Sequence, residues 1–231
     1  MTAAYDLFVR ELQAQGRERL DGLSLGNLLQ LPPDEHALVV AQLEQGLARR
    51  DPRVPIALAV MEPGASTVAL LRAAAPLSGP GPAPAPASAS APGLALGPGQ
   101  ASATADHFVL EVAAALGVLE GAPDALNLLE QALRSATEPW ARGIATDGLR
   151  RALPTSDASA RLGRMLRTLE SEDLRIEAAD TLLQRHGWRI EDVSRKAETL
   201  QLMRALIGAD GAGRDAALVK VLKTPVKSWP T

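Results

Sequence analysis

Asp51-Pro52-Arg53-Val54-Pro55-Ile56-Ala57 returns later in the chain as Asp173-Leu174-Arg175-Ile176-Glu177-Ala178-Ala179. Each stretch has an acidic residue, a basic residue two positions on, and a small residue four positions after that. Charged residues at the start of a helix, followed by a small residue, are typical of a helix whose flank packs closely on a neighbour. The duplicated stretch therefore predicts a fold of repeated helices.

The two stretches resemble the second helix of HEAT-like and armadillo-like repeats, in which an Asp-x-Arg pair opens the inner helix. The resemblance implies an all-α fold, an α-solenoid of antiparallel helix pairs. A weaker copy at residues 138–144 has Trp140 in place of the arginine, so the number of repeats stays open. The positions that carry the resemblance are Asp51, Arg53, Ala57, Asp173, Arg175 and Ala179.

The spacing of the two stretches agrees with such an array. They begin at residues 51 and 173, an interval that holds three periods of about 41 residues, where HEAT-like repeats have about 40 to 47. If the Pro-rich segment between them is left out of the count, the repeats must be irregular.

Composition also favours helices. The 231 residues are 46% hydrophobic and only 3% aromatic, so the core must be built from small and aliphatic side chains, which suit closely packed helices. The chain has no cysteine, which excludes disulfides, thiolate metal sites and a cysteine nucleophile.

The chain divides into three parts. We expect residues 1–77 to form the N-terminal helical part of the array, and residues 106–231 to form C-terminal repeats that pack with it as one domain. Between them, residues 78–105 are almost entirely Gly, Pro, Ala and Ser, which predicts a disordered insertion. This insertion is interpreted as a tether, with a Pro-rich ligand for a partner as the alternative.

Helical periodicity gives expectations about which side chains are buried. In the helix that follows Pro32 and Pro33 we expect Leu38, Ala41 and Leu47 on the buried side, and in later helices Trp140 and Ile176. The glycine-rich residues 208–215 are expected to form a loop, because no strand precedes them and their spacing does not fit a dinucleotide site.

Charge argues against nucleic acid as a partner. The formal net charge is −3, so the field of the whole chain does not attract phosphate. Seven arginines lie between residues 134 and 167. We expect them to lie on solvated helix surfaces with intrahelical partners; the alternative is a local basic face. They are Arg134, Arg142, Arg150, Arg151, Arg161, Arg164 and Arg167.

The sequence predicts no membrane span, no cofactor and no metal site. No segment reaches the roughly 18 apolar residues that a span requires, and no leader pattern follows Met1, so a cytoplasmic location is expected. No nucleotide-binding or hydrolase motif is found. His36, His107 and His186 each lack a second ligand at helical spacing, which leaves only a metal site assembled from distant helices as an alternative.

These exclusions favour a non-catalytic bacterial protein-binding module, most specifically an immunity protein that neutralises a cognate secreted toxin. The alternatives are a general scaffold or adaptor and, third, a helical-repeat DNA glycosylase, which uses Trp and Asp in a basic concave groove. The oligomeric state stays open.

Four residues are candidates for the partner-binding surface, namely Arg53, Arg142, Arg175 and Trp188. Arg53 and Arg175 have a structural alternative, in which each bonds to the turn before its helix. Trp188 and Trp229 are expected to be exposed anchors for a partner, whereas Trp140 is expected in the core or on a ridge.

Overall fold

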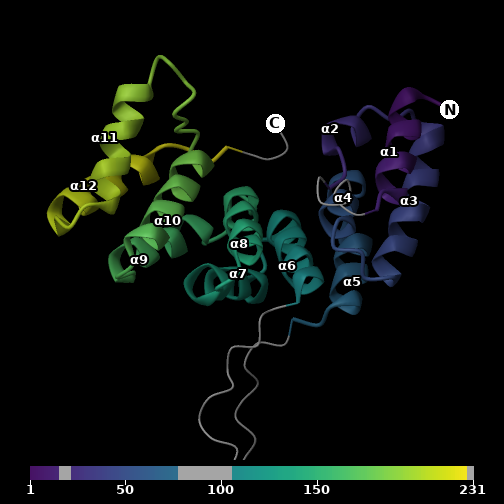
Figure 1. Cartoon of the computed structure of the whole chain (residues 1–231), viewed down its shortest axis with the longest axis horizontal. Helices are drawn as coiled ribbons and strands as arrows, with labels where there is room; N and C mark the ends of the chain where they lie inside the picture. The colour runs from purple at the N-terminus through teal and green to yellow at the C-terminus, as the bar shows by residue number, and fades with distance from the viewer. Residues whose placement is uncertain (16–21, 78–105, 228–231) are drawn as a thin grey trace, which may run out of the picture.

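The computed structural model describes residues 1–15, 22–77 and 106–227. Of these residues 72% are helical and none is in a strand, which confirms the all-α fold (Figure 1). The helices are α1 (Ala3–Gln13), α2 (Leu25–Leu28), α3 (Pro33–Ala48), α4 (Val54–Met61), α5 (Ala65–Ala74), α6 (His107–Glu120), α7 (Pro123–Ser135), α8 (Pro139–Arg151), α9 (Ala158–Thr168), α10 (Glu172–Arg185), α11 (Lys196–Ile207) and α12 (Gly211–Lys223).

Local sequence explains where many of these helices begin. Pro33, Pro123 and Pro139 each occupy the first residue of a helix, where the missing N–H costs nothing. At other starts a side chain accepts a hydrogen bond from a free backbone N–H. Asp106 does so for the N–H of Phe108 at the start of α6, at 3.0 Å.

The even-numbered helices form a row. α4 contacts α6, α6 contacts α8 and α8 contacts α10, and each of them also contacts the odd-numbered helix that precedes it. Figure 1 shows the result as an arch, with α1–α5 at one end, α6–α8 in the middle and α9–α12 at the other end. α11 extends the row by contacting α10, and α12 contacts both α11 and α9.

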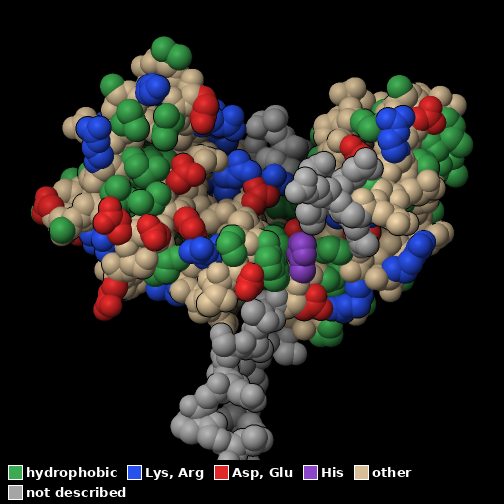
Figure 2. Space-filling model, viewed as in Figure 1, with side chains coloured by type: hydrophobic (Ala, Val, Ile, Leu, Met, Phe, Trp, Pro, Cys, Tyr) green, Lys and Arg blue, Asp and Glu red, His purple; other side chains and the backbone are tan. Residues whose placement is uncertain are grey.

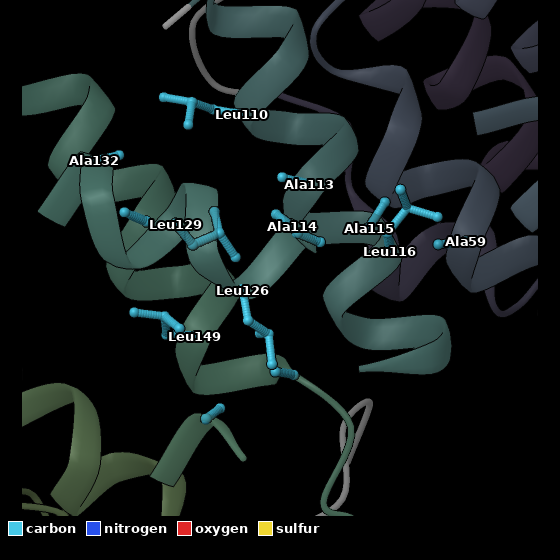
Figure 3. Packing of buried hydrophobic residues seen from close by; sticks show 14 of the residues in the cluster. Ala59, Leu110, Ala113, Ala114, Ala115, Leu116, Leu126, Leu129, Ala132 and Leu149 are labelled. Atoms are coloured by element: carbon cyan, nitrogen blue, oxygen red, sulfur yellow. The ribbon is translucent and has the colours of Figure 1, made fainter. Parts of the chain in front are cut away.

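Alanine, leucine and glycine let the central helices approach closely, as the composition indicates. Figure 3 shows Leu126 and Leu129 of α7 between the buried alanines of α6 and Leu149 of α8. A β-carbon on Gly148 of α8 would lie 2.9 Å from Leu129 and 3.0 Å from Ala114. Only glycine fits this crossing without displacing its neighbours.

The helices on either side of residues 78–105 pack against each other. α4 and α5 both contact α6, and Arg50 spans the ends of that segment by donating to Ala74 O at 3.3 Å and to Asp106 at 2.6 Å. The hydrogen bond from Arg50 lowers the pKa of Asp106. The predicted disordered insertion, residues 78–105, lies outside the described residues.

Several expectations about burial were wrong. In α3, Leu38 is 49% exposed and Ala41 is also exposed. Leu47 is buried as expected, but on a face that it shares with Val39 and Leu43. Ile176 of α10 is 39% exposed, so it does not lie on a buried side. α3 is apolar on two sides, so periodicity alone did not determine which side meets the core.

The glycine-rich residues 208–215 are not all loop. Gly211 begins α12, because Asp210 caps that helix through the N–H groups of Ala212 and Gly213. The glycines of this segment argued against a helix, although Asp210, which caps α12, was already visible in the sequence.

Candidate functional site

Arg53, a candidate for partner binding, is used inside the protein. Its guanidinium donates to the carbonyl oxygens of Glu11 at 2.6 Å and Leu12 at 3.0 Å, near the end of α1. It also forms an ion pair with Asp51 at 2.7 Å, and only 7% of its side chain is exposed. Arg53 thus makes bonds of a structural kind, to Asp51 just before its helix and to the end of α1, and most of its guanidinium donors are already used.

Arg175 has the same role with different acceptors. Its Nη1 donates to the carbonyl oxygens of Leu169 and Glu170, each at 3.0 Å, just after α9 ends. The two sequence copies are not in the same helical register, however. Asp51 and Arg53 lie before α4, whereas Asp173 and Arg175 lie in the first turns of α10.

Arg142 joins two helices of the even-numbered row. Its Nη1 lies 3.5 Å from Glu177 Oε1, which links α8 to α10. The Nε of Arg142 and Oε2 of Glu177 are buried without a hydrogen-bond partner. Arg142 and Arg175 are therefore the two candidate arginines that are partly exposed and also have a buried Nε without a hydrogen-bond partner.

Trp188 is buried, so the expectation that it is exposed was wrong. Only 4% of its surface is accessible, and Arg195 lies over its ring at 3.6 Å from the centroid, an arrangement that fixes both side chains. The backbone N–H of Trp188 donates to Leu183 O at 2.8 Å, which folds the ring back onto α10. Trp229 lies outside the described residues.

Arg185 is a residue that sequence reasoning missed. It is 1% exposed and is among the largest fully buried side chains. Burial lowers its pKa to about 10, so the guanidinium stays charged at neutral pH. Its acceptors lie at the end of α8, in the turn that follows and at the start of α9. They are the carbonyl oxygens of Leu149 (3.2 Å), Arg150 (3.1 Å), Ala152 (2.5 Å) and Leu153 (3.0 Å) and the hydroxyls of Ser156 (3.3 Å) and Ser159 (2.9 Å).

A pocket opens where α4, α6 and α8 meet. Its volume is about 600 Å³, and residues 22–25 and 52–56 complete its wall. It lies within the range of 300 to 1,000 Å³ that is usual for ligand pockets. Of the four candidate residues only Arg53 lines it, while Arg142 lines a smaller adjoining hollow, so the structure does not bring the four together.

The aromatic part of this pocket comes from His107 and Trp140. Their ring centroids are 4.9 Å apart with the planes 31° from parallel, close to a stacked arrangement. Burial lowers the pKa of His107. Trp140 was expected in the core or on a ridge; it is 39% exposed, so the core position is wrong and an aromatic surface faces solvent here.

Glu111 is one of the titratable residues that line the pocket. Its side chain is only 21% exposed, and burial raises its pKa to about 7, with Asp147 adding to the effect and Arg151 opposing it. Its Oε1 lies 3.7 Å from Nε2 of His107. At neutral pH this carboxyl group is therefore close to half-protonated.

The arginines around Glu111 are held by neighbouring carboxylates. Asp147 forms ion pairs with Arg150 and, at 2.9 Å, with Arg151, both on the same helix. Arg134 and Arg161 likewise pair with Glu130 and Asp157 four residues away. Intrahelical partners are thus confirmed for Arg134, Arg150 and Arg151, whereas Arg161 is buried and also pairs with Glu130 of α7, so for Arg161 the expectation of a solvated surface was wrong.

Figure 2 shows the distribution of these groups on one face of the molecule. Hydrophobic side chains reach the surface beside a histidine over α6 and α8, and positive and negative side chains lie close together between α8 and α10. This mixed surface offers an apolar contact next to charges that are already paired.

The comparisons with known proteins do not identify this pocket. No family model matches the chain, and no curated protein or solved structure is significantly similar to it. Within residues 1–15, 22–77 and 106–227, no group of three or more acidic or histidine side chains is placed to hold a metal ion. No helix in this part of the chain is long and apolar enough to cross a bilayer.

Proposed function

We propose that this chain is a HEAT-like α-solenoid that acts as a non-catalytic protein-binding module. The row α4, α6, α8 and α10 supports the solenoid, because each member contacts the next and the odd-numbered helix before it. In such arrays the row of inner helices forms an extended binding surface.

The observation that carries the proposal is the exposed Trp140 at the wall of the pocket. Tryptophan is enriched among the few residues that dominate the energy of protein interfaces, where it fills or borders a desolvated pocket. Here 39% of a large aromatic side chain is left in contact with water beside a hollow of about 600 Å³. Covering it with a partner side chain would bury apolar area at little entropic cost, because stacking on His107 already orders the ring.

The bonding of the arginines also favours a polypeptide partner over nucleic acid. Arg53 and Arg175 are bonded to carbonyl oxygens of neighbouring turns, and Arg150 and Arg151 are paired with Asp147. Guanidinium groups whose donors are already bonded, or that are paired with a carboxylate, contribute less to a phosphate-binding surface than free ones do. A polypeptide suits this face better than a nucleic acid backbone does.

Within this class we favour an immunity protein for a secreted bacterial toxin, with a general scaffold or adaptor as the alternative. A preorganised helical surface is what inhibition by binding alone requires. The test is co-expression with the product of a neighbouring toxin-like reading frame. An immunity protein restores growth and forms a stoichiometric complex, whereas a scaffold gives no protection and purifies with several unrelated proteins.

The binding surface itself is tested with Trp140→Ala. We expect this variant to lose at least about tenfold in affinity for the partner polypeptide, as for a tryptophan at the centre of an interface. Leu222→Ala on α12 is the matched control, because Leu222 is 42% exposed and lies outside the pocket. Equal affinity of both variants and the wild type would exclude the pocket as the binding surface.

One observation favours a second candidate, a DNA glycosylase. Trp140, Asp147 and Arg151 line the same pocket, although the sequence alone gave no motif joining a tryptophan to an aspartate. The test is release of free base from a duplex oligonucleotide that carries an N-alkylated base. Release that is abolished by Asp147→Asn would replace the binding proposal, and the absence of release above the uncatalysed rate would remove this candidate.

A further inference from the structure

The chemistry of the pocket around Glu111 indicates what part of a polypeptide it accepts. The carboxyl group lies in a hollow between α4, α6 and α8, with the exposed part of Trp140 in the same wall. A carboxylate and an aromatic face together form the usual surroundings of a bound ammonium or guanidinium group. An acidic group would be repelled by the ionised form of Glu111. A purely apolar group would desolvate that form without compensation.

Among the charged residues that line the pocket, Arg53, Asp147 and Arg151 are already in ion pairs, so Glu111 is the group left to bind a cation. Arg53 faces the pocket from α4 but is bonded to Asp51 and to the end of α1. On α8, Arg151 is paired with Asp147 at 2.9 Å, and its charge also acts on Glu111, whose pKa it lowers. His107, on the same helix as Glu111, lies 3.7 Å from it. Burial lowers the pKa of His107, so it is mainly neutral at physiological pH.

We propose that this pocket takes a lysine or arginine side chain of the partner polypeptide, with the cationic group between the Glu111 carboxylate and the ring of Trp140. This inference rests on the proposed function, because it assigns the partner residue that the protein-binding face recognises. The long aliphatic stem of either side chain lies along the apolar wall near Ile56 and Ile144, which also line the pocket, and its charged end reaches the carboxylate.

Binding of a cation here is coupled to a proton. The bound cation stabilises the ionised form of Glu111, so the carboxyl group that is half-protonated at neutral pH releases its proton on binding. Affinity therefore rises with pH. For one group that titrates near pH 7, the gain between pH 6 and pH 8 is about tenfold.

The experiment selects binders from a random peptide library against the full chain. The peptides enriched on the wild-type protein are expected to share a lysine or arginine. Replacing that residue by norleucine or citrulline, which keep the shape and remove the charge, is expected to weaken binding at least about tenfold. Calorimetry at pH 6 and pH 8 then measures the proton coupling.

Variants assign the effect to the pocket. Glu111→Gln is expected to weaken the basic peptides by the same factor, to make the norleucine and citrulline substitutions nearly neutral, and to remove the pH dependence. Trp140→Leu keeps an apolar wall and loses the aromatic face, so it is expected to weaken the same peptides independently of Glu111. Glu44→Gln, on the exposed side of α3, is the matched control and leaves affinity unchanged, and thermal unfolding of each variant confirms that it is folded.

The outcomes separate the two proposals. Enriched peptides that lack a shared basic residue, or whose basic residue contributes equally in Glu111→Gln, overturn the cation pocket while the protein-binding function stands. If no peptide is enriched and the chain binds an alkylated DNA duplex instead, both proposals fail.

Discussion

The two ends of helix α8 differ in how the arginines around them are bonded. At its C-terminal end the guanidinium of Arg185 is buried and donates to four carbonyl oxygens and two hydroxyls. At its N-terminal end Trp140 and Arg142 are partly exposed, and Arg142 Nε has no hydrogen-bond partner. Arg185, whose donors are used inside the protein, holds the fold, whereas Trp140 leaves an aromatic surface in contact with solvent, which a ligand can cover.

Other arginines along the row of helices also donate to carbonyl oxygens. Arg53 satisfies carbonyl oxygens at the end of α1, Arg175 those that follow α9, and Arg214 those of Leu206 and Gly208 at the end of α11. Helix C-termini leave carbonyl oxygens without partners, and a cation there is favourable. These arginines are therefore structural, while in our proposal the binding chemistry falls to Glu111 and Trp140.

The largest expected effect is that of removing Arg185. Arg185→Leu deprives at least four carbonyl oxygens of their donor inside the protein, so we expect a loss of about 3 kcal/mol or more in the free energy of unfolding. Urea denaturation measures it. The control is Arg189→Leu, an exposed arginine four residues later, which should change stability by less than about 0.5 kcal/mol. Similar small losses in both variants would show that the bonds to the end of α8 do not hold the fold.

Arg53 should have a smaller effect of the same kind. Arg53→Ala removes two bonds to α1 and leaves Asp51 without this ion pair, for which we expect a loss of about 2 kcal/mol. Arg49→Ala removes an exposed side chain that bonds only within its own helix and should be nearly neutral. If Arg53→Ala instead keeps full stability and weakens the partner, Arg53 is a binding residue after all.

Glu111 gives stability a pH dependence with a definite sign. Its pKa is about 7 in the folded protein against the ordinary 4.5, so the folded state holds more protons than the unfolded state between these values. Stability therefore falls as pH rises from about 4.5 to 7, by up to about 3 kcal/mol since each pKa unit is worth about 1.4 kcal/mol. Glu111→Gln should remove this component and be more stable than wild type at pH 8, as denaturant unfolding at several pH values will show. An unchanged pH profile in the variant would contradict the buried position of the carboxyl group.

The smallest effects compare two glycines of α8. Gly148→Ala places a β-carbon against Leu129 and Ala114 and should cost about 1 to 2 kcal/mol through overpacking. Gly143→Ala meets nothing within 4 Å and should stabilise by about 0.5 to 1 kcal/mol, because alanine favours the helix. Changes of the same sign in thermal unfolding would mean that α6 and α8 are not closely packed at Gly148.

Local signals explain why much of the fold was predictable. Helices at α4 and α10 were indicated by proline at helix starts, glycine at turns and the duplicated acid-x-base stretch. Gly187 has the positive φ of 75° that is expected at the end of α10. These features depend only on neighbours in sequence. The buried side of α3 was misjudged because its choice depends on helices elsewhere in the chain.

The site was less predictable for the same reason. Glu111 and Trp140 come from different helices, and no periodicity relates them. Arg185 bonds to residues 26 to 36 positions earlier, so its sequence neighbours contain no trace of its role. Trp188 looked exposed because it follows His186 and Gly187 beyond a helix end, but the backbone turns it back onto α10.

The central claim is that the face around Trp140 and Glu111 binds a polypeptide. Hydrogen–deuterium exchange of the full chain, with and without a selected peptide, tests it most directly because it locates the contact without altering a residue. The account predicts slower exchange in α6 and α8 around the pocket and unchanged exchange in α3 and α12. Protection confined to α3, α5 or α12 would contradict it.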